Sequence, residues 1–189
     1  MGQAELAVVR TPASSRVLDS LVAQESVRTV LDAAVEGVEA KLTASPEAAL
    51  AWEPVPLSAY AGELPDVIRS SWVFVVRAGA CSGPERHPNS RQRMVSYRGS
   101  GDLQVWSGAG WRSNHLVSHH QAPIRRRWVS VPPNTWHQAV AGEANWAVVS
   151  FHTVSEDALI EERPEAGDHA LTRRRLYVES DSHTRDTPS

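Results

Sequence analysis

The chain has 189 residues, of which 41% are hydrophobic, which is enough for one folded domain with extensions. Its formal net charge of −3 and pI of about 6.2 create no overall positive field, so we expect neither nucleic acid nor a membrane surface as a partner. A single cysteine, Cys81, excludes an internal disulfide. Together with the lack of a signal-like or membrane-spanning apolar run, this favours a cytoplasmic protein.

Two helical patterns are predicted in the first 50 residues. The first follows Thr11 and Pro12, an N-cap with proline at the first helical position. The second is expected to run from near Ser26 to about Ser45. Its apolar stripe, at three- and four-residue steps, consists of Val27, Val30, Leu31, Ala34, Val35, Val38 and Leu42. We expect these helices to cap the rest of the domain or to form a dimer interface; recognition of a separate partner is the alternative.

From Trp52 onward the pattern favours strands. Residues 70–77 are β-branched or aromatic and apolar almost throughout, which is typical of a central strand covered on both faces. Residues 92–98 alternate, and residues 102–106 are the predicted hairpin partner because a glycine-rich turn separates the two. Further strands are predicted at residues 128–131 and 146–152.

The C-terminal part is predicted to contain one short helix and one strand. Ser155 is a candidate N-cap with an acidic first turn behind it, and Pro164 is expected to stop that helix. Residues 171–177 could add an edge strand or pack on a neighbour. Residues 179–189 are polar and are predicted to be disordered.

Two clusters of polar residues are interpreted as solvated surface. His119 and His120 are adjacent, so on a strand their side chains would point to opposite faces and could not easily share a metal. The run 125–127 is three arginines, for which the edge of a sheet is the favoured place and a grip on an anionic substrate the alternative.

The residues with the richest chemistry lie between Gly79 and Gly99. Glu85 and His87 are two apart on a predicted extended segment, so their side chains point the same way. Gln92 follows at the start of the alternating run that ends before Gly99.

This spacing resembles the first motif of the cupin family, Gly-x5-His-x-His-x3–4-Glu-x6-Gly, and residues 132–137 resemble its second motif, Pro-x-Gly-x2-His. By position, Glu85 takes the place of the first histidine and Gln92 that of the glutamate, while His87 and His137 keep the other two. The resemblance covers about residues 56–155. It implies a mainly β fold, a cupin (double-stranded β-helix or jelly-roll) barrel with N-terminal α-helices. The domain prediction is a helical extension at 1–50, the barrel at 51–165 and a partly disordered segment at 166–189.

In cupins the four motif positions hold one divalent metal, so the resemblance implies Glu85, His87, Gln92 and His137 as metal ligands. Two imidazoles and one carboxylate suit iron(II), which we favour, or manganese, nickel or zinc. Glu85, His87 and Gln92 are also the predicted catalytic residues. In the alternative, the barrel has no metal, Glu85 pairs with a nearby arginine and His87 acts as a general acid or base.

The predicted function is that of a metal-dependent enzyme acting on a small organic substrate, with a non-haem oxygenase or dioxygenase favoured. A metal-assisted lyase, isomerase or cyclase is the first alternative, and a non-catalytic ligand-binding or sensory barrel is the second. A homodimer is consistent with the apolar N-terminal helices. The predicted wall of the substrate pocket consists of Trp72, Met94, Tyr97, Trp136 and His152.

Overall fold

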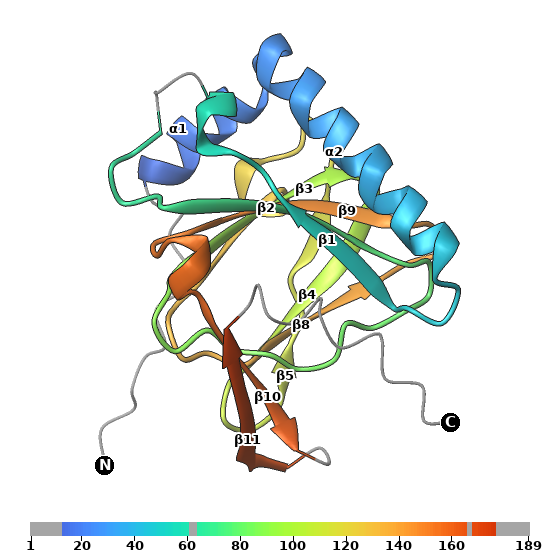
Figure 1. The fold of residues 1–189 in the computed structure, drawn as a ribbon, viewed down its shortest axis with the longest axis vertical. Coiled ribbons are helices and arrows are strands. Elements are labelled where there is room, and N and C mark those ends of the chain that lie inside the picture. The colour runs from blue at the N-terminus through green and yellow to red at the C-terminus, as the bar shows by residue number, and fades with distance from the viewer. Residues whose placement is uncertain (1–12, 61–63, 166–167, 177–189) are drawn as a thin grey trace.

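The computed structural model describes residues 13–60, 64–165 and 168–176, and two helices come first in the described chain (Figure 1). They are α1 (Ala13–Val22) and α2 (Glu25–Ala44). The strands that follow are β1 (Leu50–Pro54), β2 (Ser70–Val76), β3 (Gln92–Arg98), β4 (Ser100–Trp106), β5 (Trp111–Arg112), β6 (His115–Val117), β7 (Trp128–Val131), β8 (His137–Ala141), β9 (Trp146–His152), β10 (Ile160–Glu165) and β11 (Asp168–Leu176). Within the described residues, no helix combines the length and apolar character that crossing a membrane requires.

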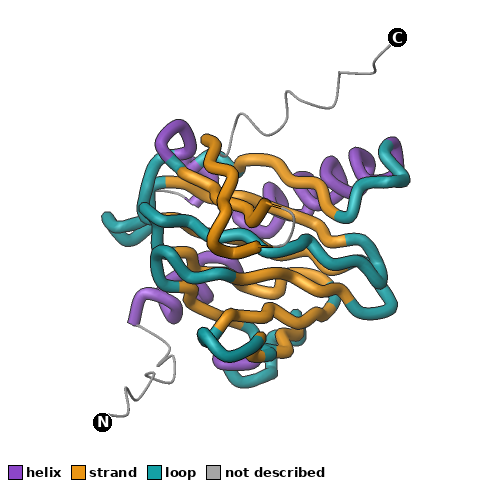
Figure 2. The backbone as a smooth tube through the Cα atoms, turned by 90° about the horizontal axis from the view of Figure 1, so that it is seen from below, coloured by secondary structure: helices purple, strands orange, loops and turns teal. Residues whose placement is uncertain are grey.

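The strands form two antiparallel sheets and a separate hairpin. One sheet has the order β1-β2-β9-β3-β7, the other has the order β5-β4-β6 with β8 also paired to β4, and β10 pairs with β11. Figure 2 shows the strands running side by side across the molecule, with the helices partly hidden behind them. A buried cluster that includes Met94, Leu103 and Val148 joins the inner faces of the two sheets. The predicted fold class is confirmed at the level of a mainly β fold with two antiparallel sheets and N-terminal helices.

Helix α2 covers the outer face of the five-stranded sheet, as Figure 1 shows. Its buried residues are Val27, Leu31, Ala34, Val35, Val38 and Leu42, which is the predicted stripe without Val30. Val30 is 39% exposed, so the apolar face is narrower than predicted. Strand β2 lies between this helix and the inner core and is buried along nearly its whole length, as a strand covered on both faces should be.

The predicted hairpin between residues 92–98 and 102–106 is wrong. Strands β3 and β4 follow one another directly, but β3 pairs with β7 and β9 while β4 pairs with β5, β6 and β8. The chain therefore changes sheets at Gly99. This residue has φ +81°, and a Cβ here would lie 2.7 Å from the backbone oxygen of Asn145. Glycine permits this turn because it has no Cβ.

The helix predicted to run from Ser155 to Pro164 is also wrong. The structure has one 3-10 turn at Glu156–Ala158, and strand β10 then contains Pro164 itself. Proline is tolerated because β10 is an edge strand whose register with β11 shifts between Pro164 and Glu165. Strand β11 overlaps the predicted edge strand at 171–177. Thr11, Pro12 and residues 179–189 lie outside the described residues.

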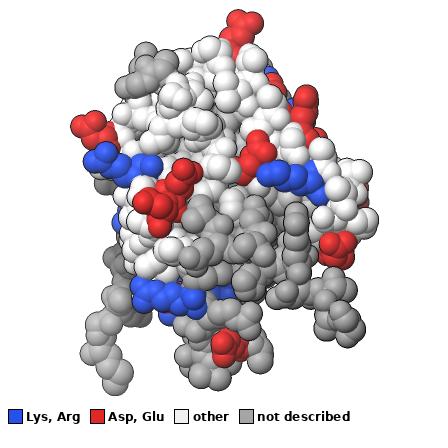
Figure 3. All heavy atoms as spheres, in the orientation of Figure 1, with Lys and Arg blue, Asp and Glu red and all other residues white. Residues whose placement is uncertain are grey.

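Charged side chains occur in small separate groups among the described atoms on the face seen in Figure 3. Acidic and basic residues lie near one another there, in keeping with the small net charge of −3. The run 125–127 divides in the structure. Arg125 and Arg126 are exposed, whereas Arg127 forms an ion pair with Asp19 of α1.

Gly101 should not accept a side chain. A Cβ at this position would lie 2.1 Å from the ring of Trp146, which is fully buried and has no room to move. We expect Gly101→Ala to lower the free energy of unfolding by about 1–3 kcal/mol, the usual cost of overpacking. Urea unfolding followed by tryptophan fluorescence measures this.

The matched control is Gly110→Ala, because a Cβ at Gly110 would meet nothing within 4 Å. Its effect should stay within about 0.5 kcal/mol. Equal effects of the two substitutions would contradict the close contact between Gly101 and Trp146.

Candidate metal centre

Backbone pairing brings the two motif segments together. Glu85 and His137 form an isolated antiparallel bridge in which each backbone N–H donates to the other residue's carbonyl, at 2.9 and 2.8 Å. His87 lies two residues beyond Glu85, so both side chains leave the extended segment on the same side. The ring of His137 then faces them from the start of β8. Two segments some fifty positions apart in the chain thus share one side of the barrel interior.

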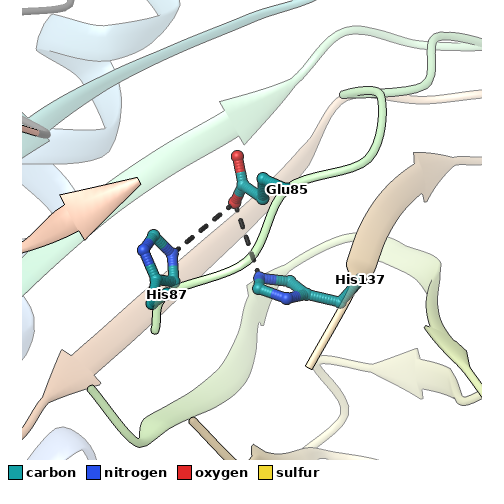
Figure 4. A group of neighbouring side chains, drawn as sticks. All are labelled: Glu85, His87 and His137. Atoms are coloured by element: carbon teal, nitrogen blue, oxygen red, sulfur yellow. Dashed lines mark ion pairs between the residues drawn. The ribbon is translucent and has the colours of Figure 1, made fainter. Parts of the chain in front are cut away.

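Three donor atoms converge in this place, as Figure 4 shows. One ligand atom each from Glu85, His87 and His137 lies within 4.8 Å of the other two. Oε1 of Glu85 is 3.9 Å from Nε2 of His87 and 3.5 Å from Nε2 of His137. Both imidazoles are buried, at 3% and 2% exposure. This arrangement can hold a metal ion.

Two backbone carbonyls determine which nitrogen of each imidazole faces Glu85. Nδ1 of His87 lies 3.0 Å from the carbonyl oxygen of Ile160, and Nδ1 of His137 lies 3.0 Å from that of Thr135. A carbonyl only accepts, so each Nδ1 carries the hydrogen. In the neutral ring the other nitrogen, Nε2, then presents a lone pair. Nε2 of His137 has no hydrogen-bond partner among the described residues.

Arg163 of β10 keeps the Glu85 carboxylate charged. Its Nη2 donates to Oε2 of Glu85 at 2.6 Å, and its Nε donates to Oε1 of Glu161 at 2.9 Å. Burial alone would raise the pKa of Glu85, but the Arg163 guanidinium, followed by His137 and His87, holds that pKa well below its usual range. Since Arg163 engages Oε2, Oε1 is the oxygen left facing the histidines.

Burial favours the neutral form of two histidines in this region, His87 and His152. The pKa of His87 is lowered mainly by desolvation, which outweighs the opposing charge of Glu85. The pKa of His152 is lowered well below its usual value by desolvation and then by His87 and His137. Neutral imidazole is the form that offers a lone pair to a metal.

A small cavity adjoins two of the three side chains, Glu85 and His137. It has a volume of about 20 Å³, which is room for about one water-sized occupant. Its walls are Leu50, Phe74, Ser82, Glu85, Gln92, Met94, Leu103, His137 and Ala139. Oε1 of Gln92 is buried and has no hydrogen-bond partner among the described residues. Gln92 therefore shares the wall of this cavity with Glu85 and His137.

Of the five predicted wall residues, Met94 lines this cavity. Tyr97 does not, because it projects from the other face of β3 and donates to Asp32 of α2 at 2.9 Å. Trp72 is fully buried against Leu159 and Trp52. Compared with the prediction, the wall of the observed cavity therefore contains more aliphatic residues, and its aromatic residue Phe74 was not among those predicted.

The remaining two predicted wall residues lie near the centre without lining its cavity. Trp136 packs under the guanidinium of Arg86, which is 4.5 Å from the ring centroid. His152 lies against the far side of His87, edge to face, with a ring-centroid distance of 5.0 Å. Its Nδ1 is 3.3 Å from the hydroxyl of Ser90. His152 therefore supports the orientation of His87.

Sequence reasoning missed the contribution of β10. The arginines considered as partners of Glu85 were its close neighbours in sequence, whereas its partner is Arg163. Arg86 instead binds Glu162, with Nη2 2.7 Å from Oε2. The alternation of Glu161 and Arg163 on one face with Glu162 on the other was the available signal for a strand here. This strand was not predicted because Pro164 was interpreted as the end of a helix.

Comparisons with known proteins find similarity at the level of structure. No family model and no curated protein sequence matches the chain. One similar solved structure is oxalate oxidase in complex with glycolate, at 14% identity over 58% of this chain and 53% of that chain, with a TM-score of 0.45. Pumpkin seed globulin matches at 17% identity over 61% and 28%, with a TM-score of 0.46.

A third similar structure is the capsular polysaccharide assembling protein CapF from Staphylococcus aureus, at 10% identity over 59% of this chain and 30% of that chain, with a TM-score of 0.45. The matched region is thus about half of the oxalate oxidase chain and less than a third of the other two. At these identities the likeness concerns the fold and says nothing about substrate or reaction.

The burial of His87 predicts that it stays neutral in acid, and its contact with the carbonyl oxygen of Ile160 predicts which nitrogen carries the hydrogen. We expect the metal-free protein to keep His87 neutral, with hydrogen on Nδ1, at about pH 6.5, where an imidazole in water is half protonated. Ring ¹⁵N chemical shifts measure this, with the urea-unfolded protein as reference. Burial lowers the pKa of His87 and of His152 in the folded protein, whereas in the unfolded chain both take up protons as the pH drops below about 6.5. The free energy of unfolding should therefore fall over this pH range. Hydrogen on Nε2 of His87 would contradict the geometry.

Proposed function

We propose that Glu85, His87 and His137 hold one divalent metal ion, with iron(II) favoured, and that the chain is a metal-dependent cupin enzyme acting on a small organic substrate. One observation carries the proposal: a charged carboxylate oxygen and two imidazole nitrogens oriented as acceptors face one another at a buried point. Three convergent lone pairs repel one another unless a cation lies between them. A proton shared by His137 and Glu85 would be the other way to relieve this repulsion.

The charges around the site fit a divalent cation. Glu85 and Glu161 contribute two negative charges, and Arg163 contributes one positive charge. With neutral histidines the net charge is −1, which a divalent ion would turn into +1. Burying carboxylates without a nearby positive charge would be costly. Arg163 therefore also lowers the electrostatic cost of holding Glu85 and Glu161 together before a metal binds.

Two imidazoles and one carboxylate form a donor set that suits iron(II), manganese, nickel or zinc and leaves coordination positions open. Such an ion would supply a binding point for substrate heteroatoms and for oxygen or water. Glu85 would offer Oε1 while Arg163 retains Oε2. Gln92 would offer its amide oxygen as a neutral fourth donor or orient the substrate.

The cavity walls support limited access of water to the centre. Phe74, Leu50, Met94 and Leu103 surround the polar side chains with apolar surface. Apolar walls strengthen the electrostatic interactions inside them and protect reactive species from hydrolysis. This favours oxygenase chemistry, in which water must be kept from the reacting atoms. Lyase, isomerase or cyclase chemistry would use the same ligands with the metal as a Lewis acid.

Metal content is the first test. Elemental mass spectrometry of protein purified without chelating resin should find close to one divalent ion per chain. We expect Glu85→Ala and His137→Ala to weaken metal binding by at least about 100-fold, because each removes a direct ligand. Glu156→Ala, at an exposed residue of a 3-10 turn, is the matched control and should retain metal. A wild-type protein that stays metal-free after reconstitution, although folded, would overturn the proposal.

Oxygen uptake then separates the candidate reactions. Iron-loaded protein is mixed with a panel of small hydroxy acids, diketones and catechols in an oxygen electrode, with His137→Ala as the inactive control. Oxygenase activity predicts uptake matched to substrate loss. Substrate loss without uptake, unchanged under nitrogen, would replace the oxygenase by a lyase or isomerase. Binding without any turnover would indicate a ligand-binding barrel.

A further inference from the structure

Strand β3 presents a second set of polar groups on its reverse face. Gln92 and Met94 point into the barrel, so Arg93 between them points to the helix-covered side. Arg93 is only 7% exposed. Its Nε and Nη1 are buried and have no hydrogen-bond partner among the described residues. A guanidinium this deeply buried normally has a partner, because an uncompensated buried charge is costly.

Ser130 lies directly across from Arg93. The two residues are register partners in the β3–β7 pair, so their side chains share one face. Ser130 is 5% exposed, and its hydroxyl also lacks a hydrogen-bond partner among the described residues. Nε and Nη1 of Arg93 and the hydroxyl of Ser130 therefore lie on the same face of paired strands, and none of these groups has a hydrogen-bond partner among the described residues.

A second arginine raises the positive charge at this place. Arg91 is two residues before Arg93 and so lies on the same side of the extended chain. After burial, the charge of Arg91 is the second cause that lowers the pKa of Arg93. Asp19 binds Arg127 and Nε1 of Trp128, the residue two before Ser130 on β7. The described part of the chain thus supplies no negative charge to Arg93.

We propose that Arg93, Ser130 and Arg91 bind a small oxyanion, such as a phosphate or a carboxylate group, on the helix-facing side of the five-stranded sheet. Guanidinium N–H groups match the oxygens of both anions, and a serine hydroxyl can donate a further hydrogen bond. The site is separated from the metal centre by the thickness of the sheet. It therefore does not depend on the function proposed for Glu85, His87 and His137.

The test is calorimetric titration of the full chain with inorganic phosphate and, separately, with acetate, at an ionic strength held constant with sodium chloride. We expect saturable binding of at least one anion, accompanied by a matching rise in the thermal unfolding midpoint. Arg93→Met should abolish both effects. Ser130→Ala should weaken binding by about 10-fold, as loss of one hydrogen bond to a charged group does. Arg125→Met, at an exposed arginine, is the control and should bind as the wild type does.

The two ligands identify the anion class, since binding of phosphate alone indicates a phosphate site and binding of acetate indicates a carboxylate site. Arg93→Met should fold, because it removes a buried charge without leaving an ionised partner. In buffer without either anion it should be at least as stable as the wild type. The proposal is overturned if neither anion shifts the midpoint more than sodium chloride does, or if both shift Arg93→Met equally.

Discussion

The candidate metal centre depends on two hydrogen bonds from imidazole to backbone. The carbonyl oxygens of Ile160 and Thr135 accept from Nδ1 of His87 and His137, which forces the Nε2 lone pairs toward Glu85. Without these acceptors each ring could exchange its nitrogens, and one ring could donate to the carboxylate instead. Because backbone atoms supply both contacts, the orientation depends on the position of whole segments. The turn before β8 and the first residue of β10 are thus part of the site.

Strand β10 also sets the electrostatics of the centre. Arg163 binds Glu85 and Glu161 together, which keeps the half-buried Glu85 carboxylate charged, whereas burial by itself would raise its pKa. Arg86 and Glu162 form a bridge through their backbones and an ion pair through their side chains, so β10 is attached to the motif segment itself. The charged residues here are therefore paired and buried together, which is the condition under which buried charge is tolerated.

Strand β3 separates two environments by simple alternation. Its inward residues, Gln92 and Met94, face the metal centre, and its outward residues, Arg93 and Val95, face the helices. Among the described residues, Oε1 of the inward Gln92 and Nε and Nη1 of the outward Arg93 lack hydrogen-bond partners, and these two residues are adjacent in sequence. A central strand of a two-layer fold can in this way serve different ligands on its two faces without competition between them. Helix α2 covers one layer and β4 with β8 forms the other.

The sequence by itself determined the local features of this protein. The 3.6-residue period identified α2, runs of apolar, β-branched and aromatic residues identified β2 and β9, and the two-residue period placed Glu85 with His87 on one side, because all of these signals depend only on neighbouring residues. The spacing of the two motifs also brought His137 into the expected ligand set. Tertiary structure decided the partner of β3, the face on which Tyr97 lies, and the arrival of Arg163 at Glu85. These depend on contacts between segments far apart in the chain, where burial and hydrogen bonding of the whole fold outweigh local preference. For the same reason Pro164, a helix stop by local rule, lies in an edge strand.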